Sequence, residues 1–302
     1  MSPLATALGA YSLSSPLVAA SGTVGSVIDF AKVIDFSLYG AATVKSVAPE
    51  SWPGRKPPRI TPGEIGMLNG IGIQNPGIDA WIETHASSLD ALPTDVWGSV
   101  VAHDVAGFAE VAAKMASVGV AAIEVNLSCP NLDGVPFALD AMLSAEVVRS
   151  VRSATGLPIG AKLSSDAQPI SRVAAAVQNA GADWVVVSNT VMGARIDPDT
   201  RKPALSGLIG GYSGAPIRPI AIKSVLEVTR DVPGLPIVGC GGVSHADHVV
   251  EFMLAGASAV ALGSAHFKTP RIARRITRDL KRYMRRRKIS SITELIGAFE
   301  PW

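Results

Sequence analysis

Eight short apolar segments recur along the chain, and stretches with helical periodicity separate most of them. Within each segment the apolar residues are continuous rather than alternating, which is typical of parallel strands covered on both faces. The helical stretches supply that cover, so the pattern predicts an α/β fold with a parallel sheet. The apolar segments span residues 16–22, 41–47, 96–103, 121–128, 157–164, 183–190, 235–242 and 259–265, and the main helical stretches span residues 106–118, 141–154, 168–180, 216–230 and 246–255.

Eight β–α units over about 250 residues predict a TIM (β/α)8 barrel. A doubly wound open sheet also alternates strands and helices, and it remains the alternative. We favour the barrel because eight units fit the length without leftover sequence, and no linker divides residues 1–302 into two domains. Residues 48–66 interrupt the rhythm with five prolines and the pair Arg55-Lys56. We expect this segment to form an excursion after the second strand, beside the mouth of the barrel.

Glycines follow several of the helical stretches. Gly119, Gly156, Gly181 and Gly256 stand where a helix would end, and each is predicted to adopt the left-handed conformation that caps a helix. An Ala-Gly-Ala sequence surrounds the last two, directly before a new apolar segment. Such a sequence suits a tight turn from helix to strand.

Composition excludes several classes of protein. The chain has 27 basic and 25 acidic residues, so its net charge of +2 predicts no nucleic-acid partner. No run of about 18 apolar residues marks a membrane span, and the first residues lack the pattern of a signal peptide. The two cysteines, Cys129 and Cys240, give neither a disulfide framework nor a metal-binding spacing. We therefore expect a soluble cytoplasmic protein.

The segment Asn-Leu-Ser-Cys-Pro-Asn, residues 126–131, directly follows the apolar core of the fourth predicted strand. An isolated cysteine in such a corner is usually just buried. Here Asn126 and Asn131 flank Cys129, and buried amides are costly unless they have partners. A thiol has an ordinary pKa of about 8.5 and can act as a base if its thiolate is stabilised, while amides bind polar rings. This segment is a candidate active site.

Active sites of TIM barrels lie where strands end and loops begin. Glycines mark the ends of the last two predicted strands, where barrels commonly bind phosphate through bare backbone N–H groups, and the segment 210–214 adds a glycine-rich loop. The chemically distinctive residues at the strand ends are Ala20, Ser21, Lys45, Ser46, Asn126, Lys162, Asn189, Thr190, Gly241, Gly242, Gly263 and Ser264, with the loop 69–75 beside them.

Two of these residues are lysines at the ends of buried strands. A salt bridge to a nearby acid such as Glu124 would account for a buried lysine. An anionic cofactor would account for both Lys45 and Lys162, because reduction of a flavin places negative charge at the N1–C2=O edge of its ring. The phosphate site, the lysines, the amides and the thiol together indicate a flavin-dependent oxidoreductase acting on a small polar ring.

These motifs resemble those of class 1 dihydroorotate dehydrogenases, and within that class the 1B type, the catalytic subunit of a heteromeric enzyme. The resemblance extends from about residue 15 to residue 297 and implies a TIM barrel that binds FMN. Its most specific pieces are ASGT at 20–23, GMLNGIGIQNPG at 66–77, NLSCPN at 126–131, NTVMG at 189–193, GGYSG at 210–214 and GCGGV at 239–243.

The resemblance also implies roles for individual residues. Cys129 would be the base that removes the C5 proton of dihydroorotate while C6 passes a hydride to FMN, giving orotate. The substrate would be held by Lys45, Asn69, Ile71, Gly72, Ile73, Asn126, Asn131, Asn189 and Thr190. The FMN contacts would be Ala20, Ser21, Lys45, Ser46, Asn126, Lys162, Gly214, Gly241, Gly242, Gly263 and Ser264.

The 1B type implies a homodimer and a second subunit with FAD and an iron–sulfur cluster that passes electrons to NAD. The chain lacks the membrane-binding extension of class 2, so a quinone acceptor is not expected. One departure is the third strand, where 1B enzymes usually carry an asparagine beside the flavin and residues 99–103 have none. We interpret His103 as a residue of the barrel rim. Two alternatives remain: a flavoprotein acting on another dihydropyrimidine such as dihydrouracil, and a non-catalytic paralog that binds FMN.

Residues 271–288 contain ten arginines and lysines. A nucleic-acid or membrane surface is one interpretation. Ile272, Ile276, Leu280 and Met284, however, repeat at helical spacing between the basic residues. That pattern favours the last barrel helix, with its basic face in solvent.

Overall fold

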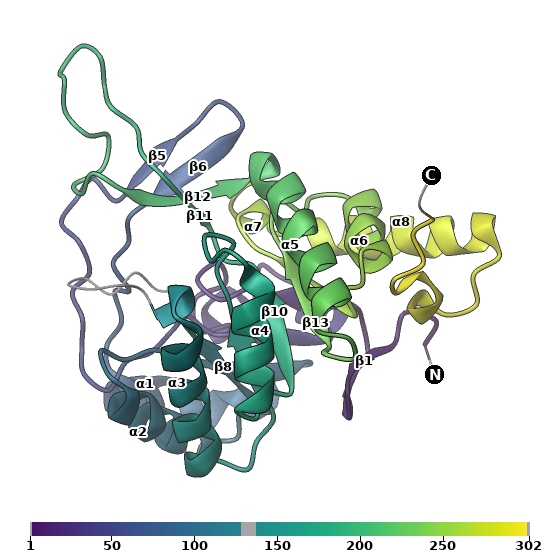
Figure 1. Ribbon diagram of the computed structural model, residues 1–302, viewed down its shortest axis with the longest axis horizontal. Coiled ribbons are helices and arrows are strands. Elements are labelled where there is room, and N and C mark those ends of the chain that lie inside the picture. Colours follow the sequence, from purple (N-terminus) through teal and green to yellow (C-terminus); the bar gives the residue numbers. More distant parts are fainter. Residues whose placement is uncertain (1, 128–136, 301–302) are drawn as a thin grey trace.

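A closed barrel of eight parallel strands forms the centre of the computed structural model, which describes residues 2–127 and 137–300 (Figure 1). Closure of the sheet confirms the predicted TIM barrel and excludes the open doubly wound sheet. Each of the eight apolar segments contains one strand. In chain order these are β3 (Leu17–Ala19), β4 (Ala41–Thr43), β7 (Asp95–Val100), β8 (Ala122–Asn126), β9 (Ile159–Lys162), β10 (Trp184–Val187), β13 (Ile237–Cys240) and β14 (Ala259–Leu262).

Helices cover the outside of the barrel, and their buried faces are mostly apolar, as the periodicity predicted. Aspartates cap two of them: Asp104 accepts from the backbone N–H of Gly107, and Asp140 from those of Met142 and Leu143. The helices are α1 (Ile78–His85), α2 (Val105–Ala116), α3 (Ala141–Ala154), α4 (Ile170–Asn179), α5 (Arg218–Asp231), α6 (Ala246–Leu254), α7 (Ala265–Lys268) and α8 (Ile272–Arg287). Short 3-10 turns are η1 (Ile28–Phe30), η2 (Phe36–Leu38), η3 (Ala86–Ala91), η4 (Phe137–Leu139), η5 (Ala215–Ile217) and η6 (Ile292–Leu295).

The amino-terminal hairpin, β1 (Thr6–Leu8) and β2 (Tyr11–Leu13), was not predicted. Its leucines join the core inside the barrel, where the ring of Tyr11 stacks on Trp184 at 5.5 Å and Trp97 lies 5.0 Å from Trp184. Trp97 belongs to the first half of β7 and Trp184 begins β10. This end of the barrel is therefore filled, and the carboxyl ends of the strands remain for chemistry.

The excursion after β4 forms part of a second sheet beside the barrel, as Figure 1 shows. It contains β5 (Ile60–Pro62) and β6 (Gly66–Asn69), which pair with β12 (Gly210–Gly214) and β11 (Val191–Gly193) in the antiparallel order β11-β12-β6-β5. The prediction that residues 210–214 form a loop was wrong. Glycine lets this strand lie close to its neighbours, since a Cβ at Gly211 would stand 2.1 Å from Oγ1 of Thr190.

Three of the four predicted glycine caps are confirmed. Gly119, Gly181 and Gly256 have φ values of 88°, 107° and 118°. Gly156 does not have a positive φ: Thr155, the residue after α3, is already extended, and its hydroxyl accepts from the N–H of Leu157. The left-handed turn is not needed where a threonine side chain ends the helix.

Helix α8 packs against the barrel by the predicted face. Ile272, Ile276, Leu280 and Met284 are all buried, and the basic side chains between them face outward. This confirms the prediction of a barrel helix with a solvated face. Within the ranges that the structure describes, no helix has the length and apolar character needed to cross a membrane.

Candidate active site

The predicted site residues follow the carboxyl ends of the barrel strands, so the fold brings them to one mouth. Ala20 and Ser21 follow β3, and Lys45 and Ser46 follow β4. Neighbouring ends are joined directly: the Ser21 hydroxyl donates to the carbonyl of Val44 at 2.7 Å, and the N–H of Ala20 donates to the carbonyl of Leu262 at the end of β14.

A hydrogen-bonded chain runs from the mouth into the barrel. The amide of Asn126, at the end of β8, donates to Oγ of Ser46 at 3.0 Å. The hydroxyls of Ser46 and Ser99 are hydrogen-bonded at 2.9 Å, and both serines are buried. Ser99 is the cross-strand neighbour of Glu124. The strand on which the family asparagine is missing thus contributes a serine instead. His103 lies exposed beyond it, with its ring 4.2 Å from that of Trp52 and tilted by 32°, as expected of a rim residue.

Lys162 and Glu124 are buried inside the barrel. Nζ of Lys162 lies 3.9 Å from Oε1 of Glu124, so the salt bridge weighed as an alternative is present. Burial raises the pKa of the Glu124 carboxyl, and the Lys162 ammonium and the Ser99 hydroxyl oppose that rise. Oε1 of Glu124 has no hydrogen-bond partner among the described residues. Lys162 is also the register partner of Asn126, so the ammonium and the amide come from adjacent positions at the mouth.

The second cysteine belongs to the same interior. Cys240 ends β13 and is buried, and desolvation raises the pKa of its thiol above the usual range. A thiol with a raised pKa stays protonated at neutral pH and makes a poor base.

Three glycine-bearing segments meet at the other side of the mouth. A Cβ at Gly242 would lie 2.8 Å from the carbonyl oxygen of Gly214 and 2.9 Å from Cβ of Arg218. Gly241 and Gly242 have φ values of 148° and 67°, so a side chain there would also be strained. Gly263 differs, because its nearest side-chain atoms would be 4.0 Å from an added Cβ, which leaves open space over its backbone.

Arg218 at the start of α5 is a residue of this corner that sequence reasoning missed. Its guanidinium contacts the ring of His248 at 2.9 Å and forms an ion pair with Glu251 at 3.0 Å. Burial and the adjacent Arg218 lower the pKa of His248 to about 4, so the cation of this corner is the arginine. No motif marks Arg218; only the approach of Gly242 to its backbone places it here.

Six of the residues predicted to hold substrate lie on two further segments. Asn69 ends β6, and its amide donates to the carbonyl of Gly211 at 3.1 Å. Ile71, Gly72 and Ile73 follow it, half-buried, with the last two at φ values of 69° and 53°. On the other segment, Asn189 and Thr190 follow β10. The side-chain oxygen of Asn189 accepts from the N–H of Thr190 at 2.8 Å.

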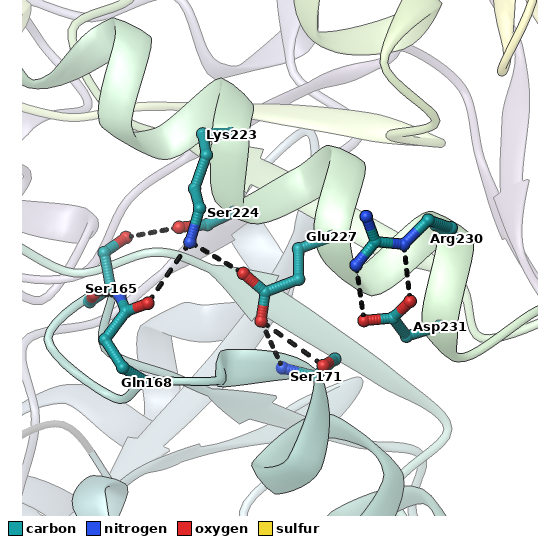
Figure 2. A network of polar contacts seen from close by, with 8 residues as sticks. All are labelled: Ser165, Gln168, Ser171, Lys223, Ser224, Glu227, Arg230 and Asp231. Atoms are coloured by element: carbon teal, nitrogen blue, oxygen red, sulfur yellow. Dashed lines mark hydrogen bonds and ion pairs between the residues drawn. The ribbon is translucent and has the colours of Figure 1, made fainter.

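A serine network holds the turn that carries Asn189. The Ser165 hydroxyl donates to Ser188 at 2.6 Å, and the Ser224 hydroxyl donates to Ser165 at 3.1 Å. Figure 2 shows how α5 meets the loop before α4: Lys223 bridges Gln168 and Glu227, and Glu227 accepts from Ser171. Asn189 is therefore fixed to packed elements of the barrel wall, although it stands at the mouth.

Two predicted residues, Cys129 and Asn131, lie outside the described residues. Their assignment therefore remains a prediction from the motif. The flanking positions are consistent with it, because β8 delivers Asn126 to the mouth and the described chain resumes at Phe137, which is buried.

A buried histidine supports the backbone under two predicted cofactor contacts. Nε2 of His266 lies 2.8 Å from the Tyr39 hydroxyl and Nδ1 lies 3.1 Å from the Thr23 hydroxyl. Thr23 donates its proton to the carbonyl of Ala20, so it accepts from Nδ1–H, and Tyr39 donates to Nε2. His266 also contacts the backbone of Gly263. The neutral ring thus ties Ala20 to Gly263.

We expect this histidine to make the protein acid-sensitive. Burial lowers the pKa of His266 from 6.5 to about 4, so the unfolded chain binds the proton more readily. The free energy of unfolding should therefore fall as the pH drops from 6.5 towards 4, by about 3 kcal/mol in total. Urea unfolding between pH 4 and 8 measures this. His266→Gln should remove this contribution to the pH dependence, whereas the exposed control His245→Gln should keep it. If the free energy of unfolding changed equally with pH in both variants, His266 would not be the source of the acid sensitivity.

The observed corner suits the predicted flavin mononucleotide. Gly214, Gly241 and Gly242 present backbone without side chains, and Gly263 leaves open space beside Ala20. A phosphate would be held there, near Arg218, and the flavin ring would extend towards Lys45, Asn126 and Lys162.

A cavity of about 370 Å³ lies away from this mouth, between η2 and the beginning of α8. Lys32, Tyr39, Arg271 and Arg274 are among its lining residues, and none of the predicted site residues lines it. We therefore place the site by the strand ends rather than by this cavity.

Comparison with known proteins supports the resemblance. A family model described as dihydroorotate dehydrogenase matches residues 3–284. Three curated relatives are each named dihydroorotate dehydrogenase B (NAD(+)), catalytic subunit. That of Shouchella clausii is 36% identical, covering 98% of both chains. That of Desulforudis audaxviator is 39% identical, covering 97% of this chain and 96% of its own. That of Citrifermentans bemidjiense is 40% identical, covering 98% of both.

These matches extend over nearly the whole chain rather than over single motifs, and they confirm the predicted oxidoreductase family and its B type. Because the family model and these relatives match nearly the whole of a chain that folds into a closed barrel, we conclude that the chain belongs to the dihydroorotate dehydrogenase family.

Proposed function

We propose that this protein oxidises dihydroorotate to orotate in pyrimidine biosynthesis, with FMN as the cofactor and Cys129 as the base. The observation that carries this proposal is the register of β8 and β9, which places Asn126 and the buried Lys162 at paired positions on neighbouring strands. One group binds a polar ring, and the other stabilises negative charge. Both stand at the mouth that the glycine corner shares.

Bound FMN supplies a hydride acceptor. The chain supplies the rest of the chemistry: Cys129 takes the proton from C5 of the substrate, and the amides of Asn69, Asn126, Asn131 and Asn189 bind its ring and carboxylate. Lys45, which extends from β4 past Gly22, adds positive charge on the substrate side. The serine network behind Asn189 keeps that amide in place.

Lys162 provides a test of the cofactor assignment. Lys162→Ala should weaken FMN binding or lower the reduction potential of the bound flavin, because positive charge near the flavin edge favours the anionic reduced form. Fluorescence titration of apoprotein with FMN and a reductive titration measure the two quantities. Lys223→Ala is a matched control, since this lysine pairs with Glu227 on the outer helix α5. If Lys162→Ala left the FMN affinity and the reduction potential of the flavin unchanged, Lys162 would serve only as the salt-bridge partner of Glu124.

The proposal has two competitors, which one experiment separates. The yellow holoenzyme is mixed anaerobically with dihydroorotate or with dihydrouracil, and the flavin absorbance is followed. Bleaching by dihydroorotate alone supports the proposed substrate. Bleaching by dihydrouracil would indicate another dihydropyrimidine, and bleaching by neither would leave a protein that only binds FMN.

We also propose a homodimer of this chain that works with a second subunit carrying FAD and an iron–sulfur cluster. The relatives described above are named as catalytic subunits of an NAD-dependent enzyme. Among the described residues, no group of histidines, cysteines or acids could hold a metal ion. Electrons destined for NAD would therefore leave through a partner.

A further inference from the structure

The hydrogen-bonded chain under the mouth leads from Asn126 through Ser46 to Ser99, and Ser99 lies opposite the carboxyl group of Glu124. Asn126 donates to Ser46, so the single proton of that hydroxyl is left for Ser99. Ser99 in turn faces Glu124 across β7 and β8. In its ionised form, which the nearby Lys162 ammonium and the Ser99 hydroxyl favour, Glu124 only accepts hydrogen bonds. The Ser99 proton is then directed towards the acid, and this order fixes which end of the Asn126 amide faces the serines.

Glu124 also sets the charge balance at Lys162. Its side chain is 3% exposed and that of Lys162 is 7% exposed, so water screens the pair little. Their 3.9 Å separation is too long for a hydrogen bond, which leaves the ammonium close to the acid without being bound to it. Such an ammonium can attract a second anion at the mouth, while the negative charge of the carboxylate partly cancels the positive potential there.

We propose that Glu124 is a positioning residue with two effects: through Ser99 and Ser46 it orients the Asn126 amide towards the substrate, and through Lys162 it holds down the reduction potential of the flavin. This inference rests on the proposed function, since it needs FMN at the mouth. Glu124 thereby has a function although its carboxyl group takes no part in the proton or hydride transfer.

Two substitutions separate the two effects. Glu124→Gln keeps the shape but removes the negative charge and adds a donor. The bound flavin should then favour its reduced form about tenfold more strongly, as expected for one unit charge roughly 10 to 12 Å away in a medium of effective dielectric constant about 20. Ser99→Ala interrupts the chain without changing any charge. It should weaken orotate binding several-fold and leave the reduction potential unchanged.

A double substitution tests whether the effect passes through Lys162. Without that ammonium, the buried Glu124 should take up a proton and become neutral, so Glu124→Gln should shift the potential little in a Lys162→Met background. Equal shifts in both backgrounds would overturn the coupling, and no shift in either would overturn the role of Glu124. A merely structural role would lower the unfolding temperature without moving the potential.

Glu227→Gln is the matched control for stability. Glu227 is likewise a buried glutamate paired with a lysine, but it lies between α5 and α4, outside the barrel (Figure 2). The Glu227→Gln substitution should lower the unfolding temperature and leave the reduction potential of the flavin and the orotate affinity unchanged. Titration of each apoprotein with FMN separates a failure of the proposed function from a failure of the role assigned to Glu124. If the wild-type protein binds no FMN, the proposed function is refuted. If FMN binds normally and Glu124→Gln has the reduction potential and orotate affinity of the wild type, only the role of Glu124 is refuted.

Discussion

Cys129→Ala is expected to keep its FMN and to lose most of its reduction by dihydroorotate. General base catalysis contributes about 10²–10⁴-fold, and alanine offers no group that accepts the C5 proton. The measurement is anaerobic stopped-flow of the holoenzyme at saturating dihydroorotate, with the rate of flavin bleaching as the readout. A variant that bleached at the wild-type rate would show that another group is the base.

Two further variants sharpen this prediction. Cys129→Ser should keep a fraction of the rate with its pH optimum moved upward, because a hydroxyl gives up its proton less readily than a thiol. Cys240→Ala is the matched control, since it removes the other cysteine of the chain. Burial keeps the Cys240 thiol protonated, so its loss should leave proton removal intact. A large loss of the bleaching rate in Cys240→Ala would show that Cys129 had been wrongly chosen as the base.

The barrel was predictable because its signal is local. Each strand is a continuous apolar run, and each helix shows one buried face, so both patterns can be read in windows of a few residues. The amino-terminal hairpin has no comparable signal. Tyr11 is held by packing against Trp184 and by hydrogen bonds to Asp95 and Trp97, residues that are far away in the sequence. Long-range contacts of this kind appear only once the barrel is closed.

The same distinction separates the predicted from the missed parts of the site. Positions such as Asn126 and Lys162 follow strand ends, and strand ends can be read from the pattern. Glycines at 210–214 indicated a loop, yet the segment is a strand, because the absence of side chains serves close packing against Asn69 and Thr190. Composition alone does not distinguish these two uses of glycine.

Residues that act through others left no signal in the sequence. The tie between Ala20 and Gly263 depends on His266, and the orientation of Asn126 depends on Ser99. Each is an ordinary residue in its own segment and becomes informative only through a contact with a distant strand. For Lys162, the salt bridge to Glu124 is present, and the role of the lysine beside a flavin stays a prediction that its place at the end of β9 motivates.

The second large effect concerns the electron acceptor. The isolated chain should contain FMN only and reduce NAD negligibly with dihydroorotate, because it has no dinucleotide fingerprint and too few cysteines for a four-thiolate cluster. Artificial dyes, which accept electrons at an exposed flavin edge, should work with the chain alone. Absorbance at the NADH band and dye bleaching, measured on the same preparation, compare the two routes.

Adding the partner subunit should restore NAD reduction by orders of magnitude while changing the dye rate little. The dye rate then acts as the internal control, since it depends on the mouth of this barrel and not on the partner. Efficient fumarate reduction by the chain alone would favour the 1A type. Rapid NAD reduction without a partner would exclude both types, because a hydride would then reach the dinucleotide directly from a barrel that has no motif to bind it.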